Sequence, residues 1–157
     1  MRENESITLN KIATDTSLLH LFIWGINTTA DLAQIASKVL AAGIAMKEKN
    51  YGSSVSLLKE AVAMEDHLNY NEPPDWFFSV RYHLGAALIR DKKYSEAEKI
   101  YRQDLQIWKK NGWALIGLYN SLIIQHKNNA AQTVKSAFDQ SWQYADIKIK
   151  SSSNIFN

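Results

Sequence analysis

Two stretches of the chain repeat one spacing of small and aromatic residues, and this recurrence constrains the fold more than any other feature. Offsets 0, 3, 7 and 10 hold Tyr51, Ser54, Leu58 and Ala61 in the first stretch and Tyr94, Ala97, Tyr101 and Asp104 in the second. Nine residues before each tyrosine stands a very small residue, Ala42 in one stretch and Gly85 in the other. A small residue lets one helix backbone lie close to its partner, and an aromatic side chain further on fills the gap to the next pair. The spacing therefore predicts repeated helical hairpins.

Apolar residues at helical spacing predict six helices. The first follows Asn27, Thr28 and Thr29, which precede an acid at Asp31, and it ends near Lys49. The others are expected over 51–67, from Pro74 or Asp75 to 90, over 94–110, over 113–126 and over 130–145. Asn50 is placed to cap the second helix, Asn128 or Asn129 to cap the sixth, and Gly112 suits a left-handed helix end.

The segment Leu68–Asp75 is the clearest interruption. Pro73 and Pro74 lack the backbone N–H of a helix interior and disfavour helical geometry in the residue before them. The three aromatic residues that follow, Trp76–Phe78, spread around a helix, so at least one is exposed unless the loop or another chain covers it. The segment therefore separates the two repeats.

The two ends of the chain lack the helical pattern. The apolar run Leu18–Ile26 is about half the roughly 20 residues that a membrane helix needs. Acidic residues precede it, and no small-residue cleavage site follows it, so it fits a signal peptide poorly. We expect it to be a short helix or strand-like cap on the first hairpin, within an amino-terminal segment 1–29. Residues 148–157 have no periodicity, which predicts a flexible, loosely held tail after a repeat domain over 30–147.

Composition narrows the class of protein. The 157 residues are 46% apolar, which is enough for a core. The net charge of +2 comes from interspersed lysine, arginine and acidic residues, so we expect no nucleic-acid partner and no membrane association. The chain has no cysteine, which excludes disulfides and thiolate chemistry and is compatible with the cytoplasmic location that we expect.

The sequence offers no catalytic or metal-binding constellation. No histidine has a second histidine or a carboxylate at the spacing that pairs ligands on one helix face. Glu65, Asp66 and His67 are adjacent and point in different directions, as at a solvated helix end. Ser53 and Ser54 lack a base and suit a helix start. We therefore expect no enzyme activity, no catalytic residue, no cofactor and no metal.

The recurrent spacing resembles that of the tetratricopeptide repeat family over residues 33–146. Three motifs are also similar to the carboxy-terminal part of longer bacterial tetratricopeptide proteins for which we know no established activity: WGIN at 24–27, YNEPPDWFFSVRYHLGAALIR at 70–90 and NGWALIGL at 111–118. The tyrosines are about nine residues further apart than the family period of roughly 34, and the proline segment accounts for the excess. Gly85 and Gly117 are closer together than one period, which makes the third repeat degenerate. The chain would then be a short homologue or the last part of a split or truncated parent.

The resemblance implies an all-α, right-handed array of three antiparallel helical hairpins with an amino-terminal capping segment. In the family, the first helix of each hairpin lines a concave groove. Carried over by position, the groove comprises Val39, Gly43, Met46, Lys47, Tyr82, Ala86, Ile89 and Arg90, and from the third hairpin Ala114, Leu118, Ser121 and Leu122.

Such a groove is apolar with two cations near one edge, and suits an extended segment or helix that carries an acid. We expect a non-enzymatic module that binds a protein or peptide and is a monomer or weak homodimer. The alternatives are a domain that binds a small acidic ligand or serves a separated enzymatic parent, and a structural self-association domain.

Overall fold

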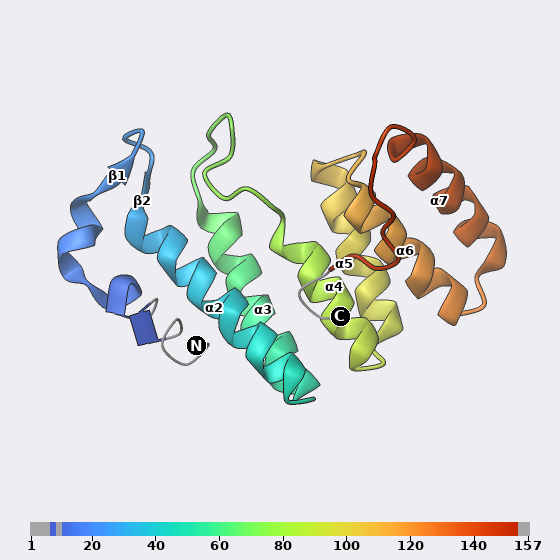
Figure 1. Ribbon diagram of the computed structural model, residues 1–157, viewed down its shortest axis with the longest axis horizontal. Helices are drawn as coiled ribbons and strands as arrows, with labels where there is room; N and C mark the ends of the chain where they lie inside the picture. The colour runs from blue at the N-terminus through green and yellow to red at the C-terminus, as the bar shows by residue number, and fades with distance from the viewer. Residues whose placement is uncertain (1–6, 9–10, 154–157) are drawn as a thin grey trace. The chain divides into compact units, whose positions relative to one another are not determined.

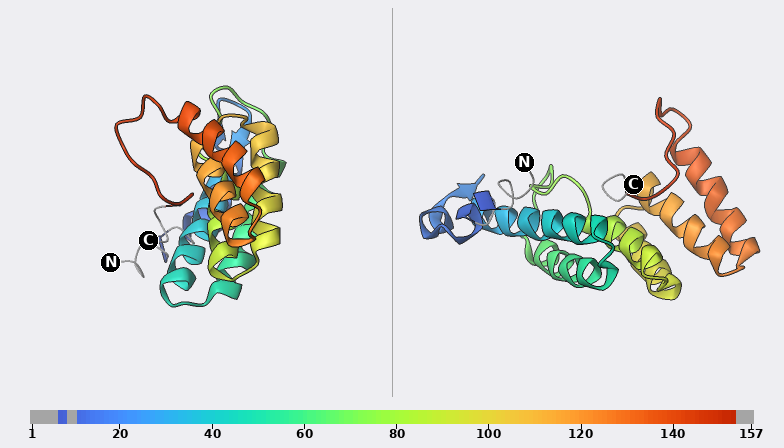
Figure 2. Two further views of the ribbon diagram at one scale, coloured as in Figure 1. Left: turned by 90° about the vertical axis from the view of Figure 1, so that its right-hand side faces the viewer. Right: turned by 60° about the horizontal axis from the view of Figure 1, so that its bottom comes forward.

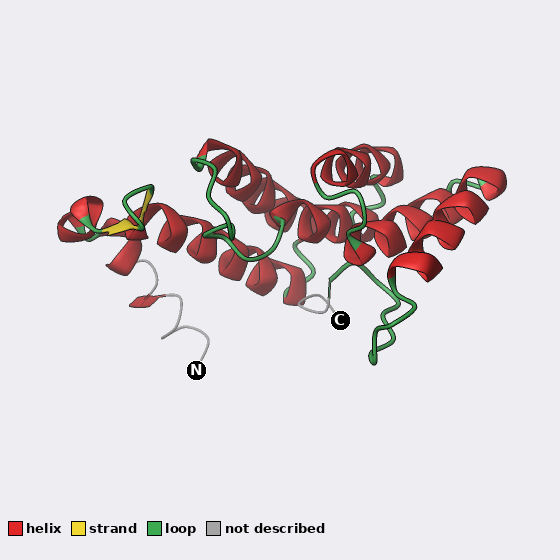
Figure 3. Cartoon of the chain, turned by 90° about the horizontal axis from the view of Figure 1, so that it is seen from above, coloured by secondary structure: helices red, strands yellow, loops and turns green. Residues whose placement is uncertain are grey.

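The computed structural model describes residues 7–8 and 11–153. These belong to two compact units, residues 1–80 and 81–157, and each is described by itself below. Helices account for most of the secondary structure, and the described part of the chain contains only two short strands (Figure 1, Figure 3). The expectation of a predominantly helical protein is confirmed. No helix in the described ranges has the length and apolar content that crossing a membrane requires.

The first unit begins with a short cap. A 3₁₀ helix η1 (Thr16–His20) leads into strands β1 (Phe22–Ile23) and β2 (Asn27–Thr28), which pair antiparallel. Both η1 and β2 contact helix α2 (Thr29–Lys47), so this segment packs on the first hairpin as the sequence predicted. The Thr28 hydroxyl accepts from the Asp31 N–H and the Asp31 carboxylate accepts from the Thr28 N–H, which fixes the start of α2.

Helix α3 (Tyr51–His67) packs antiparallel against α2 (Figure 1). The Asn50 side chain caps it by accepting from the Ser53 N–H, as predicted. The small residues bring the two helices together, because the buried Ser54 hydroxyl donates to the Ala42 carbonyl at 2.9 Å. Leu58 and Ala61, from the same recurrent spacing, are fully buried. The predicted close contact between these helices is therefore present.

The loop after α3 is tied to the amino-terminal cap. The Asn27 side chain donates to the Asn69 carbonyl and to the Asp75 carboxylate, at 3.0 and 2.7 Å. The Asn69 N–H donates to the Asn27 side chain at 2.8 Å. Asp75 is thereby held in the loop, and Trp76–Phe78 follow it there, with the Phe77 side chain 82% exposed. The aromatic exposure that the sequence predicted is found at Phe77.

The next helix, α4 (Val80–Arg90), begins later than the sequence predicted. The start at Pro74 or Asp75 is wrong, because residues 74–79 form no helix. The Val80 N–H donates instead to the Glu65 carboxylate on α3, at 3.0 Å. The first free N–H of α4 is thus satisfied by a side chain 15 residues earlier, which no local pattern reveals.

The second unit contains the rest of α4 with helices α5 (Tyr94–Ile107), α6 (Gly112–Ile124) and α7 (Asn128–Ser141). Tyr101 of α5 is fully buried, and its ring lies against the backbone at Gly85 of α4 and Gly117 of α6. A Cβ atom at either glycine would lie 2.3 Å from a Tyr101 ring carbon. The predicted role of the aromatic residue, to fill the gap between hairpins, is confirmed here.

Gly112 does not end a helix. It is the first residue of α6, capped by the Asn111 side chain, and its backbone lies so close to Trp142 that a Cβ would meet the indole at 2.2 Å. After the helices α2, α4 and α6, left-handed conformations occur instead at Lys49, Lys92 and His126, with φ of 62°, 60° and 58°. The prediction for Gly112 is therefore wrong, because this glycine is needed for close packing and not for backbone conformation.

These three left-handed residues mark one turn that occurs in each hairpin. The N–H of the following residue donates to the carbonyl five residues earlier: Asn50 to Ala45, Lys93 to Leu88 and Lys127 to Leu122, at 2.8, 2.8 and 3.0 Å. This is the Schellman pattern. From Lys93 to Lys127 the turn recurs after 34 residues. The interval from Asn50 to Lys93 is longer, because it contains the proline segment.

In the last helix, Asn128 and Lys135 stand where the recurrent spacing has Tyr94 and Tyr101 in α5. Ala131 and Phe138 are buried at the places that Ala97 and Asp104 hold in α5. Lys135 takes the place of Tyr101 and pairs with Asp139 at 2.5 Å. An ion pair on the surface of α7 therefore stands where α5 has a packing aromatic residue.

Candidate functional site

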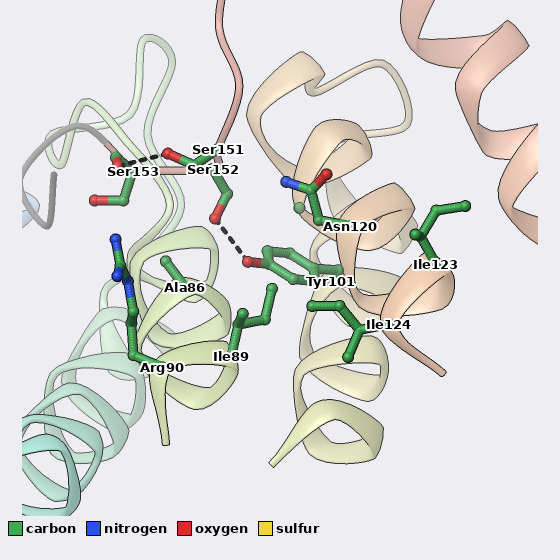
Figure 4. A pocket seen from close by; sticks show the side chains of 11 residues that line it. Ala86, Ile89, Arg90, Tyr101, Asn120, Ile123, Ile124, Ser151, Ser152 and Ser153 are labelled. Atoms are coloured by element: carbon green, nitrogen blue, oxygen red, sulfur yellow. Dashed lines mark hydrogen bonds between the residues drawn. The ribbon is translucent and has the colours of Figure 1, made fainter. Parts of the chain in front are cut away.

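A pocket of about 370 Å³ lies entirely within the second unit (Figure 4). Helix α4 forms one side and helix α6 the other, with Tyr101 between them and the carboxy-terminal segment along one edge. The lining residues are Ala86, Ile89, Arg90, Tyr101, Gly117, Asn120, Ile123, Ile124, Ser151, Ser152 and Ser153. Most of this surface is aliphatic, and Arg90 adds a positive charge. It suits an apolar group that carries a negative charge.

The two sides of the pocket come from equivalent positions, counted back from the turn that ends each helix. The α4 residues Ala86, Ile89 and Arg90 precede the turn at Lys92 by the same intervals by which the α6 residues Asn120, Ile123 and Ile124 precede the turn at His126. The repeat therefore presents the same helical face twice, and the pocket lies between the two copies. Ile123 and Ile124 are 42% and 41% exposed, so this side is open to solvent.

Tyr101 supplies the polar group at the base of the pocket. Its hydroxyl lies 2.6 Å from the Ser152 hydroxyl, which donates to the Tyr82 carbonyl at 2.9 Å. Because Ser152 has one hydroxyl proton and gives it to Tyr82, Tyr101 is the donor in the first bond. Burial raises the pKa of Tyr101, so the phenol stays protonated and keeps this direction of donation.

The carboxy-terminal segment is packed rather than loose. After α7 the chain turns back and passes α6, α5 and α4 (Figure 1, Figure 2). Ile149 is buried among Leu115, Ile116 and Phe138, and the Asn120 side chain donates to the Lys150 carbonyl at 2.9 Å. The prediction of a loosely held tail is wrong for residues 148–153, although they form no regular structure. Residues 154–157 lie outside the described residues.

His83 anchors the end of this segment. Its Nδ1 lies 2.7 Å from the Ser153 hydroxyl, and the two residues are only 4% and 2% exposed. Burial lowers the pKa of His83 to about 4, so the imidazole is neutral near pH 7. A serine beside a neutral histidine can resemble a nucleophile and its base, but here both side chains are almost completely buried, and only Ser153 touches the pocket. The geometry gives the pair a structural role.

The predicted groove residues fall into three groups. On α4, Ala86, Ile89 and Arg90 line the pocket, and the Tyr82 carbonyl holds Ser152 beside it. On α2, in the first unit, Val39, Gly43 and Met46 are buried and Lys47 is exposed. On α6, the residues carried over by the glycine spacing, Ala114, Leu118, Ser121 and Leu122, are all buried.

The residues predicted for the α6 side do not line the pocket, and those that line it lie two positions further along the helix. The prediction aligned Gly85 with Gly117, but both glycines contact the same Tyr101 ring from opposite sides and are not equivalent. Alignment of the hairpin turns leads instead to Asn120, Ile123 and Ile124. The similar turn sequences around Lys92 and His126 could have indicated this alignment from the sequence.

The serines of the carboxy-terminal segment were also missed. Residues 147–150 read Ile-Lys-Ile-Lys, an alternation of apolar and charged residues typical of a non-helical segment with one buried side.

No group of three or more His, Cys, Asp or Glu side chains in the described ranges could hold a metal ion. The pocket is thus lined by aliphatic surface, hydroxyl groups and one guanidinium, and such groups can bind a ligand.

Comparison of the chain with protein-family models, with curated proteins and with solved structures finds no match.

Proposed function

We propose that this protein is a tetratricopeptide-like interaction module whose α4–α6 face binds a segment of another protein. The observation that carries the proposal is that this face already holds a non-helical peptide segment, residues 148–153. The helix side chains bind its backbone and its small hydroxyl groups. A face that binds one such segment has the chemistry to bind another.

The repeat geometry supports the same proposal. The turns of the second and third hairpins are separated by roughly 34 residues, the length of a tetratricopeptide repeat. Pocket residues occupy equivalent positions on the first helix of each of these hairpins. Helices that repeat in this way present matching side chains along one face, which suits an elongated ligand better than a compact substrate.

Selection from a random peptide library against the full chain tests the proposal. Selected peptides should lose about tenfold or more in affinity for the Ile123→Asp variant, because a carboxylate then faces the aliphatic wall. Ile107→Asp is the matched control, since Ile107 is also exposed on a helix of the same unit but does not line the pocket. Peptides that bind both variants equally well would place the binding surface elsewhere.

The charge of Arg90 sets a further expectation. Arg90→Glu should weaken acidic peptides by roughly tenfold and leave neutral peptides unchanged, since an exposed charge affects complementarity more than folding. Fluorescence anisotropy measures the affinities, and the thermal midpoint checks the fold. If acidic peptides bound the unmodified protein and the Arg90→Glu variant equally well, Arg90 would not be part of the binding site.

A small acidic ligand is the second candidate function. The pocket volume of about 370 Å³ and its single guanidinium favour a compact ligand with an apolar body and one carboxylate. Native mass spectrometry of the purified full chain distinguishes the two candidates. A retained small molecule, released by Arg90→Glu, supports the second candidate over the first.

A further inference from the structure

Residues 148–153 make contacts that a segment of another protein could make equally well. Ile149 contributes an aliphatic side chain to a buried cluster, and the Lys150 carbonyl accepts from Asn120. Ser152 and Ser153 contribute hydroxyl groups to Tyr101, Tyr82 and His83. The Lys148 and Lys150 side chains are exposed. The contacts that anchor the segment are therefore one aliphatic group, one carbonyl and two hydroxyls in a fixed order.

The segment also leaves part of the face uncovered. Ser151 lies at the pocket edge, where its hydroxyl is turned toward the Ser153 carbonyl and donates to it at 3.0 Å (Figure 4). Ile123 and Ile124 on the far side keep about two fifths of their surface exposed. A larger apolar side chain at the position of Ser151 would add an aliphatic contact at this edge of the pocket, which the serine cannot make.

We propose that residues 148–153 are an internal ligand of the α4–α6 face, and that a partner segment of related chemistry displaces them. The partner segment is non-helical, with an aliphatic residue at the position of Ile149, hydroxyl residues at those of Ser152 and Ser153, and a large apolar residue at that of Ser151. This proposal rests on the proposed function and names its ligand. The attached segment competes at a high effective concentration, so an unattached segment needs the extra apolar contact to replace it.

Two peptides test the proposal against the full chain. One has the sequence of residues 146–153 with blocked ends, and the other carries Ser151→Leu. The first should bind the Ile149→Asp protein at least tenfold more tightly than the unmodified protein, because the substitution weakens the attached competitor. The Ser151→Leu peptide should bind the Ile149→Asp protein more tightly than the first peptide does. Ile107→Asp is the matched protein control, since Ile107 is exposed on α5 and does not line the pocket.

A second variant protects the test against misfolding. If circular dichroism shows that Ile149→Asp has lost its helices, the double variant Ser152→Gly and Ser153→Gly replaces it. That variant removes both hydroxyl anchors but keeps Ile149 in the buried cluster. A peptide that itself carries Ile149→Asp serves as the ligand control and should not bind either protein.

The outcomes separate this proposal from the proposed function. Equal affinity of the first peptide for the unmodified and the weakened proteins would overturn the internal-ligand proposal. If library-selected peptides still bind at Ile123, the interaction function stands without it. If neither the two designed peptides nor any selected peptide binds a folded protein at this face, both proposals fail.

Discussion

Replacement of Tyr101 by alanine is expected to lower the free energy of unfolding by about 3–5 kcal/mol, the usual cost of removing a buried aromatic ring. The ring fills the space between α4 and α6, where Gly85 and Gly117 have no side chain to obstruct it. Its hydroxyl also donates to Ser152, so the substitution takes one partner from that buried serine. Urea unfolding followed by circular dichroism measures the loss.

A double-mutant cycle tests whether the glycines exist to admit this ring. In the unmodified chain, Gly85→Ala should cost about 1–3 kcal/mol, because the new Cβ would lie 2.3 Å from the Tyr101 ring. In the Tyr101→Ala background the same change should be neutral or stabilising, since alanine favours a helix over glycine by about 1 kcal/mol. The coupling between the two positions measures the contact directly.

Gly52→Ala is the matched control for this cycle. Gly52 lies in α3, and a Cβ there would have nothing within 4 Å. This substitution should leave stability unchanged or raise it slightly in both backgrounds. An equal cost of Gly85→Ala with and without Tyr101 would show that the ring does not set the space at this position.

The sequence was sufficient where structure is decided locally. Both ends of α3 were predicted, because the Asn50 cap and the apolar period act within one helix. The cap of α2 was likewise visible at Thr28 and Asp31. Tyr101 was identified as the residue that fills the gap between hairpins, because only a small residue facing it permits that packing. These features depend on residues that are near in sequence or strongly restricted in size.

One local prediction is wrong, because Asn128 is the first residue of α7 and the N-cap is Lys127, with no side-chain hydrogen bond. The other failures depend on contacts between distant residues. The start of α4 depends on Glu65 accepting from the Val80 N–H, and Asp75 is engaged by Asn27 from the amino-terminal cap. The role of Gly112, at the start of α6, depends on Trp142, which follows the end of α7.

Long-range contacts also explain what the sequence missed in the candidate site. On the α4 side, the pocket is lined by Ala86, Ile89 and Arg90, which are positions that the tetratricopeptide resemblance implied for a groove. On α6, the predicted residues lie two positions before those that line the pocket. The prediction aligned Gly85 with Gly117, whereas alignment of the two hairpin turns leads to the lining residues. The docking of residues 148–153 depends on hydroxyl groups that contact Tyr101 and His83, 51 and 70 residues away. Serine adds little to a hydrophobic periodicity, so these hydrogen bonds become visible only in the folded structure.

Acidification is expected to destabilise the protein through His83. Burial lowers its pKa to about 4 in the folded chain, against 6.5 for the free group. Between these values the unfolded chain binds a proton that the folded chain does not, so the free energy of unfolding falls as the pH falls. The stabilising contribution is complete above about pH 6.5, is lost down to about pH 4, and amounts to roughly 3 kcal/mol.

His83→Asn isolates this contribution, because asparagine can still hydrogen-bond the Ser153 hydroxyl but does not titrate in this range. Urea unfolding at pH 7, 6, 5 and 4 should show that the unmodified chain loses roughly 3 kcal/mol more than the variant over the interval. His126→Asn, at an exposed turn, is the matched control and should follow the unmodified chain. If the His83→Asn variant followed the unmodified chain at every pH, His83 would not be buried in its neutral form. The carboxy-terminal segment would then lack the anchor that the His83–Ser153 bond provides.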